Sequence, residues 1–284
     1  MINLIKADFY RAKKDKILLI GLCVSIGLVL MQALLMKGLI AASGAADADT
    51  EQVAAVVGTT GLSMFLNGVS ILGNTTQYII PIFLTIFVVR EFSDKTIRNK
   101  LILGYTRPQI YASILIVHAV ISLVYYLATS LIGLISGALL FGLGVKFSAD
   151  VFGLLVIGFI LEFFLSYILI GFAIIFAINK QSVALGILIP LIVGFIISIL
   201  GAVAILNINP TLTKILSFFN FYQASEIQGM KGLSDIVVRT AIEMDDSTYY
   251  LPLTPLARIL IITPIAITAE IVIGYFKFKH IQFK

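Results

Sequence analysis

The chain has 284 residues, of which 60% are hydrophobic and only 12% are charged. Soluble globular proteins have about 45–50% apolar and about 25% charged residues, so this composition excludes a soluble fold and indicates a protein embedded in a bilayer. The net charge of +5 comes from basic residues that flank the apolar stretches, so it does not indicate a nucleic-acid partner. Cys23 is the single cysteine, which excludes an intrachain disulfide.

The first 16 residues are basic and amphipathic. Their apolar stripe, at helical spacing, consists of Ile2, Ile5, Phe9 and Ala12. Such a stripe predicts a helix lying on the membrane surface, an N-terminal elbow, with Asp8 placed off the stripe. The alternative is a disordered basic tail.

A membrane-spanning helix needs about 20 largely apolar residues. Six stretches meet this requirement approximately: 17–36, 71–89, 111–142, 151–178, 183–206 and 257–276. The first is longer than the apolar core of a signal peptide and is interpreted as an uncleaved anchor. The predicted fold is therefore an all-α integral membrane protein with six transmembrane helices, in which residues 1–284 form a single transmembrane domain.

Basic residues concentrate on one side of this predicted topology. The N-terminus, the connector 90–109 and the C-terminus carry most of the lysines and arginines, whereas acids favour the opposite side. The positive-inside rule then predicts a multi-pass protein with both termini in the cytoplasm. On the outer side, the segment 207–256 is too long for a plain loop and predicts short helices at the outer leaflet before the last span.

The connector 90–109 contains signals for a short cytoplasmic helix. Ser93 or Asp94 is placed to cap its start, and Gly104 is a natural stop at its end. Thr106 and Gln109 have the spacing of a capping box that opens the next span. An ordinary basic loop would explain the charges but not these signals.

The sequence of this connector resembles the corresponding segment of permease subunits in the second ABC (ATP-binding cassette) exporter superfamily. The resemblance is in particular to permeases that export peptides, bacitracin or lantibiotics. The matching residues are Glu91-Phe92-Ser93, Thr96-Ile97-Arg98-Asn99-Lys100-Leu101, Gly104 and Arg107. The resemblance implies that the short helix is a coupling helix seated in a groove of a cytoplasmic ABC ATPase. It also implies a dimer of permease subunits, identical or different, with two ATPase copies.

The residues expected to couple the chain to the ATPase are Glu91, Phe92, Lys95, Thr96, Ile97, Arg98, Leu101 and Arg107. Ile97 and Leu101, four apart on one helical face, are expected to make the apolar contact with the partner. The chain has no G-x-x-x-x-G-K-[ST] phosphate loop, so it is not expected to be an enzyme or to bind a cofactor itself. ATP and Mg²⁺ are expected in the partner ATPase.

Polar side chains inside the predicted spans define a candidate translocation path. They are Glu162, Ser166, Glu270, His118 and Ser122. Acids in spans are costly and usually face the protein interior, where they bind a cation or lock two helices together as a protonated carboxyl. The polar face of the third span, which includes His118, either lines the path or packs against another helix. No spacing of His, Cys, Asp or Glu supports a metal site.

The fifth predicted span carries small residues and a proline at intervals of four: Ser182, Gly186, Pro190, Gly194 and Ser198. This spacing allows two helix backbones to approach closely. The seam lies either within the subunit or across a dimer.

The sequence thus predicts a permease that exports amphipathic or hydrophobic cargo, such as an antimicrobial peptide, a peptide toxin or a drug. It would work in contact with membrane lipids, in a cell membrane and most typically a bacterial plasma membrane. Alternatives are a secondary transporter driven by an ion gradient, or a membrane assembly or sensor subunit. A secondary transporter would show internal repeats, and the two halves show no convincing self-similarity.

Overall fold

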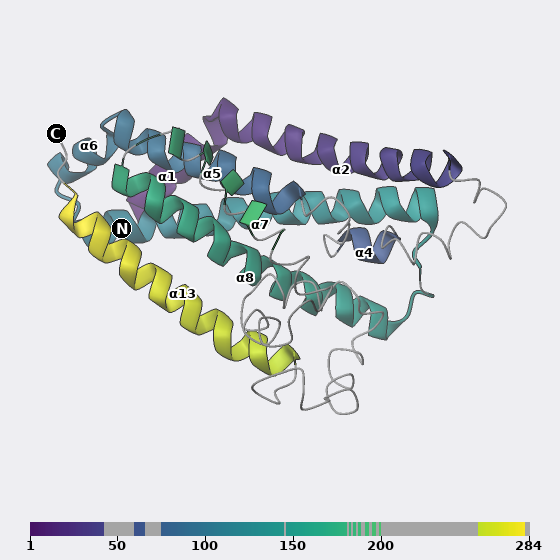
Figure 1. The fold of residues 1–284 in the computed structure, drawn as a ribbon. Coiled ribbons are helices and arrows are strands. Elements are labelled where there is room, and N and C mark those ends of the chain that lie inside the picture. The colour runs from purple at the N-terminus through teal and green to yellow at the C-terminus, as the bar shows by residue number, and fades with distance from the viewer. Residues whose placement is uncertain are drawn as a thin grey trace.

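The computed structural model describes residues 1–42, 60–65, 75–144, 146–180 and 255–281, together with isolated positions between 182 and 199. Throughout these residues the regular structure is α-helical, as the composition predicts. Figure 1 shows long helices running beside one another, with α1, α6 and both ends of the chain gathered at the same end of the molecule.

Helices α1 (Ile2–Lys14) and α2 (Lys16–Ala42) are joined at Asp15. The Asp15 carboxylate accepts a hydrogen bond of 2.8 Å from the Ile17 backbone N–H, the usual way to satisfy a free donor at a helix start. Helix α2 is apolar on all sides, and Leu19 is 66% exposed. A helix of this length that is apolar all round is suited to a membrane.

The predicted stripe on α1 is only partly correct. Its buried residues are Leu4, Asp8 and Ala12, whereas Ile2 is 70% exposed. The inward face is rotated toward Asp8 because the carboxylate of that residue pairs with a lysine from α6. Spacing alone therefore identified the helix but not its buried face.

The next four helices are α5 (Thr75–Ser93), α6 (Thr96–Ile102), α7 (Arg107–Phe141) and α8 (Ala149–Lys180). The last is α13 (Pro255–His280). Five of the predicted spans thus coincide with helices. The remaining one, the fifth span at 183–206, lies largely outside the described residues, and the predicted outer-leaflet helices of 207–256 lie outside them except at Pro255 and Leu256. Within the described residues, three helical segments are long and apolar enough to cross a membrane: Lys16–Ala42, Arg107–Phe141 and Leu260–His280.

Helix α7 is the centre of the described fold, since α1, α2, α4, α5, α8 and α13 all pack against it. Its predicted polar face is buried, and the hydroxyls on it bond to backbone carbonyls. Ser122 Oγ donates to His118 O at 2.8 Å, and Thr129 Oγ1 donates to Tyr125 O at 2.9 Å. Tyr125 Oη donates to the carbonyl of Leu18 on α2. Two of these bonds lie within α7 and one joins α7 to α2; whether the face also lines a path stays a prediction.

The short helix α4 (Gly61–Phe65) lies against the far end of α7. The Gly61 N–H, at the start of α4, donates a hydrogen bond of 3.0 Å to the carbonyl of Gly142, the residue that follows α7. A Cβ on Gly133 would lie 2.6 Å from Met64 O, and one on Gly137 would lie 2.8 Å from the Cα of Gly61. Both positions therefore need glycine for this approach.

Candidate functional site

The turn between α5 and α6 is made by Lys95. Its φ of 57° is left-handed, and Lys95 occupies the position before the first helical residue. The predicted capping by Ser93 or Asp94 is wrong, because the Asp94 N–H still donates to Arg90 O at 2.8 Å and continues the preceding helix. Thr96 Oγ1 instead donates to Glu91 O at 2.7 Å and ties the start of α6 to the end of α5.

The end of α6 and the start of α7 follow the sequence prediction. Gly104 has a φ of +88° and donates its N–H to Leu101 O, while Tyr105 N–H donates to Lys100 O. This pair of bonds is the Schellman ending of a helix. The capping box of α7 is also present, with Thr106 N–H donating to Gln109 Oε1 at 3.1 Å.

The two faces of α6 are the reverse of the expected arrangement. Ile97 is 0% exposed and packs in the core shared by α1, α5, α7 and α13, and Leu101 is half-buried against the same core. The apolar side chains that face outward are Ile102, which is 73% exposed, and Leu103, which is 76% exposed. The i, i+4 spacing placed Ile97 and Leu101 together correctly, but their shared face points into this protein.

Four buried or half-buried charged residues meet behind α6. They are Asp8, Arg11, Glu91 and Lys100, called the charge cluster below. Lys100 Nζ lies 2.7 Å from both Asp8 Oδ1 and Glu91 Oε2, and Arg11 pairs with the other oxygen of Glu91. The two cations balance the two carboxylates, so the cluster is neutral as a whole.

The charge cluster joins three helices and is hydrogen-bonded to a fourth. Asp8 and Arg11 come from α1, Glu91 from α5 and Lys100 from α6, while Ser113 of α7 donates to Asp8 Oδ2 at 2.7 Å. Burial raises the pKa of Glu91, and the charges of Lys100 and Arg11 oppose that rise. Such a cluster fixes the position of α6 relative to α1 and α5, because removing any member strands a buried charge.

Sequence reasoning selected Glu91 but missed its partners. Lys100 is nine positions from Glu91, but Asp8 and Arg11 precede Glu91 by 80 positions or more, so no local spacing links the two pairs. The one available signal was an acid, Asp8, within an otherwise basic amphipathic helix.

Phe92 and Arg107 hold the end of α13 rather than facing outward. The Phe92 ring meets the Phe278 ring edge-on at 6.0 Å. Arg107 Nη1 donates to the carbonyls of Lys279 and Ile281, the latter at 3.1 Å. An arginine placed on the last carbonyls of a helix stabilises its C-terminus. Among the remaining predicted coupling residues, Lys95 and Arg98 are exposed and Thr96 is half-buried.

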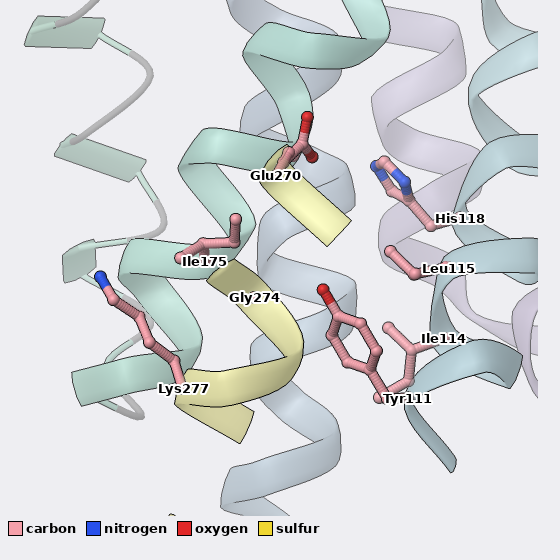
Figure 2. Close-up of a pocket in the computed structure, with 9 residues that line it drawn as sticks. Tyr111, Ile114, Leu115, His118, Ile175, Glu270, Gly274 and Lys277 are labelled. Carbon is pink, nitrogen blue, oxygen red and sulfur yellow. The ribbon is translucent and has the colours of Figure 1, made fainter. Parts of the chain in front are cut away.

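Helices α7, α8 and α13 enclose a pocket beside Glu270 (Figure 2). Residues around it include Tyr111, Leu115, His118, Ile175, Glu270 and Lys277. The structure thus brings together Glu270 and His118 of the predicted path. Ser122 does not line this pocket and bonds to its own helix.

The other candidates are not placed at side-chain level. Glu162 and Ser166 belong to α8, but their side chains lie outside the described part of the chain. Of the small-residue seam, Ser182 is described and half-buried, whereas Gly186, Pro190, Gly194 and Ser198 lie outside the described residues. The seam and its role remain predictions.

Comparison with known proteins identifies the family of this chain. The family model described as "ABC-2 family transporter protein" matches residues 4–201, which is more than half of the chain. The match spans the charge cluster, α6 and the whole of α7 and α8. A search of curated proteins finds no match to the chain.

This family consists of the membrane subunits of transporters whose ATP is hydrolysed by an ABC ATPase. The apolar helices described above agree with a place in the membrane. The chain therefore belongs to the ABC-2 transporter family and is a permease subunit that has an ABC ATPase as its partner.

Proposed function

We propose that the chain is the permease subunit of an exporter for amphipathic or hydrophobic cargo, and that α6 is its coupling helix. Antimicrobial peptides, peptide toxins and hydrophobic drugs are the cargo classes. In the working assembly two copies of the ATPase, which bind ATP and Mg²⁺, face a pair of permease subunits. Both termini and α6 face the cytoplasm of a bacterial cell.

The observation that carries the proposal is the construction of α6. The seven-residue helix exposes Arg98, Asn99 and Ile102, and Leu103, the residue at its C-terminal cap, is exposed beside them. The opposite face is fixed by Ile97 and by Lys100 in the charge cluster. A short helix whose buried face is fixed and whose exposed face is apolar and basic is suited to transmit the movement of a bound protein. A flexible loop with the same residues would not transmit that movement.

The charge cluster gives this motion a route into the membrane. Because Lys100 bonds both to α1 and to α5, a displacement of α6 moves the elbow helix and the end of α5 with it. Rigid-body shifts of packed helices of this kind are a common way to convert a local event into a domain movement.

The N-terminal helix α1 supports this arrangement. Its outward face carries Lys6, Lys13 and Lys14, and its inward face holds Asp8. A helix with this polarity lies at the headgroup level of a membrane with its basic side available to lipid phosphates. We infer that α1 is the elbow that rests on the cytoplasmic leaflet.

Co-purification of the permease with its ABC ATPase tests the coupling assignment. Ile102→Asp and Leu103→Asp place a charge on the exposed face of α6 and are expected to reduce recovery of the ATPase at least tenfold. Ile2→Asp is the matched control, because Ile2 is also 70% exposed at the same end but lies on α1. Undiminished recovery of the ATPase with both α6 variants would show that α6 does not dock it.

A further inference from the structure

The outward face of α1 carries a row of side chains at intervals of four residues. The row, called the α1 row below, consists of Ile2, Lys6, Tyr10 and Lys14. All four are exposed, Ile2 by 70% and Tyr10 by 61%. Residues three or four apart are neighbours on one side of a helix, so Lys13 adjoins the row next to Tyr10. Basic side chains thus alternate with large apolar and aromatic ones on a single surface.

The fold separates the charges of α1 by sign. The exposed charged residues of this helix are Lys6, Lys13 and Lys14. Its acid, Asp8, is only 3% exposed and pairs with Lys100 of α6 on the inward side. The outward face of α1 therefore carries positive charge that no carboxylate of the same helix neutralises. Such a face attracts a partner with negative charge.

The surroundings of these lysines favour a lipid surface over an acidic protein. Lys14 Nζ lies over the Tyr10 ring, 4.5 Å from its centre, and tyrosine is a residue enriched where membrane meets water. Asp15 alone separates α1 from the spanning helix α2, near whose start Leu19 and Ile20 are 66% and 51% exposed. Basic side chains followed directly by exposed apolar ones match the headgroup and the acyl chains of a phospholipid.

We propose that the outward face of α1 binds anionic phospholipids of the cytoplasmic leaflet in preference to zwitterionic ones. Lysine ammonium groups attract a headgroup with net negative charge, whereas a zwitterionic headgroup also presents a cation that repels them. The proposal names the partner of α1 and rests on the placement of this helix at the leaflet under the proposed function. Lipid bound on the outward face and Lys100 bound on the inward face then act on the same 13-residue helix.

A tryptophan reporter tests the proposal, because the sequence contains no tryptophan of its own. Tyr10→Trp introduces one indole into the α1 row, and an indole also accepts the Lys14 ammonium over its face. The full-length chain is placed in phosphatidylcholine vesicles that contain a fixed fraction of brominated phosphatidylcholine or brominated phosphatidylglycerol. Bromine quenches an indole that lies close to it, so the quenching gives the association constant of each lipid with this face.

The expected result is a preference for the anionic lipid. Since each lysine near an anionic surface favours binding by about fivefold, we expect phosphatidylglycerol to associate about tenfold more strongly than phosphatidylcholine. The ratio of the two association constants should fall as salt is raised, because salt screens exposed charges. Ile135→Trp is the control reporter, because Ile135 is 54% exposed on α7 and residues 108–145 contain no lysine or arginine. The two lipids are expected to quench this second reporter equally.

Two matched pairs of substitutions address the lysines directly, each made in the chain that carries the reporter of the α1 row. Lys6→Gln together with Lys14→Gln is expected to lower the ratio to about twofold, because only Lys13 remains on the outward face. Lys95→Gln together with Arg98→Gln is the control, because it also removes two exposed positive charges at the same end of the molecule but not from α1. This control is expected to leave the ratio unchanged.

Equal quenching by the two brominated lipids would overturn the proposal and leave α1 at the membrane surface. A ratio that Lys6→Gln with Lys14→Gln leaves unchanged would overturn it as well. Quenching by neither lipid would overturn both this proposal and the elbow assignment. A ratio of one, together with reduced co-purification of the ATPase with the Lys6→Gln and Lys14→Gln chain, would assign this face to the ATPase instead. No ATPase is present in the vesicles, so the lipid result does not bear on the docking of α6.

Discussion

Glu91 and Glu270 are both almost completely buried, with 2% and 4% of their surface exposed, yet their surroundings differ. Both oxygens of Glu91 are paired with cations, from Arg11 and Lys100. Glu270 has an oxygen that receives no hydrogen bond within the described structure. A carboxylate whose partners are all supplied by its own chain fixes the helices that carry those partners, whereas Glu270 is buried without a partner for one oxygen in the part of the chain that the structure describes and contributes less to holding its helix.

The difference extends to neighbouring residues. Around Glu91 the side chains interlock, and Arg11 also lies over the Phe87 ring at 4.4 Å from its centre. Around Glu270 the space is made by two glycines, Gly171 and Gly274, against which the Glu270 carboxyl and the Tyr111 hydroxyl pack. The α6 end of the molecule is thus held by paired charges, whereas the contact of α13 with α7 and α8 depends on close packing at glycine.

The largest effect is expected from Lys100→Met. It leaves Asp8 and Glu91 without their shared cation, and breaking a buried ion pair in this way costs about 3–5 kcal/mol. Thermal unfolding of the purified permease in detergent measures the loss. Lys100→Arg keeps the charge and is expected to lose much less; equal losses for the two variants would show that charge is not what Lys100 contributes.

Ile97→Ala is expected to have the next largest effect. Ile97 is fully buried, and truncating such a side chain costs about 2–5 kcal/mol through lost contacts and the cavity left behind. Leu103→Ala, on the exposed face of the same helix, is expected to change the melting temperature little while weakening ATPase binding. If the two variants melted alike, the inward and outward faces of α6 would be assigned wrongly.

Glu91→Gln and Glu270→Gln compare the two carboxyls directly. The first weakens charge-assisted hydrogen bonds to Arg11 and Lys100 and is expected to cost about 1.5–3 kcal/mol. The second replaces a buried carboxyl that lacks a complete set of partners by an amide of similar size, so the melting temperature should stay close to that of the wild type. A clear destabilisation by Glu270→Gln would mean that this carboxyl is a structural anchor, as Glu91 is.

Gly104→Ala is expected to have the smallest effect. With a φ of +88°, Gly104 ends α6 in a conformation that costs other residues about 1–2 kcal/mol. Limited proteolysis across residues 102–106 detects the resulting fraying of α6, with Gly38→Ala as control, because a Cβ there meets no neighbour. Identical cleavage of both variants would contradict a strained role for Gly104.

The sequence alone predicted where most of the described helices lie and where several of them begin and end. Long apolar runs predicted α7, α8 and α13 to within four residues at each end, whereas α2 continues six residues beyond its predicted end. Gly104 and Thr106 marked the end of α6 and the start of α7, because these signals act through neighbouring backbone atoms. Ser93 and Asp94 failed as caps because the chain turned one residue later, at Lys95, in a conformation that lysine seldom adopts.

The sequence did not predict which side of a helix is buried against the rest of the protein. Spacing grouped Ile97 with Leu101, but the direction of that face depends on α1, α5 and α13, which are distant along the chain. The same reason explains why Asp8 was placed off the buried stripe of α1. The contact between Glu270 and the space at Gly171 joins positions 99 residues apart, so no local pattern indicated it.

Site-specific cross-linking tests the docking of α6 most directly. Because Cys23 is the single cysteine, a Cys23→Ser background allows one thiol to be placed at Leu103→Cys or at Leu139→Cys. These leucines are 76% and 79% exposed, respectively, and lie toward opposite ends of the described fold. The account predicts that a short thiol cross-linker joins the ABC ATPase to position 103 and not to position 139; cross-linking at 139 alone, or at neither position in an assembled complex, would contradict it.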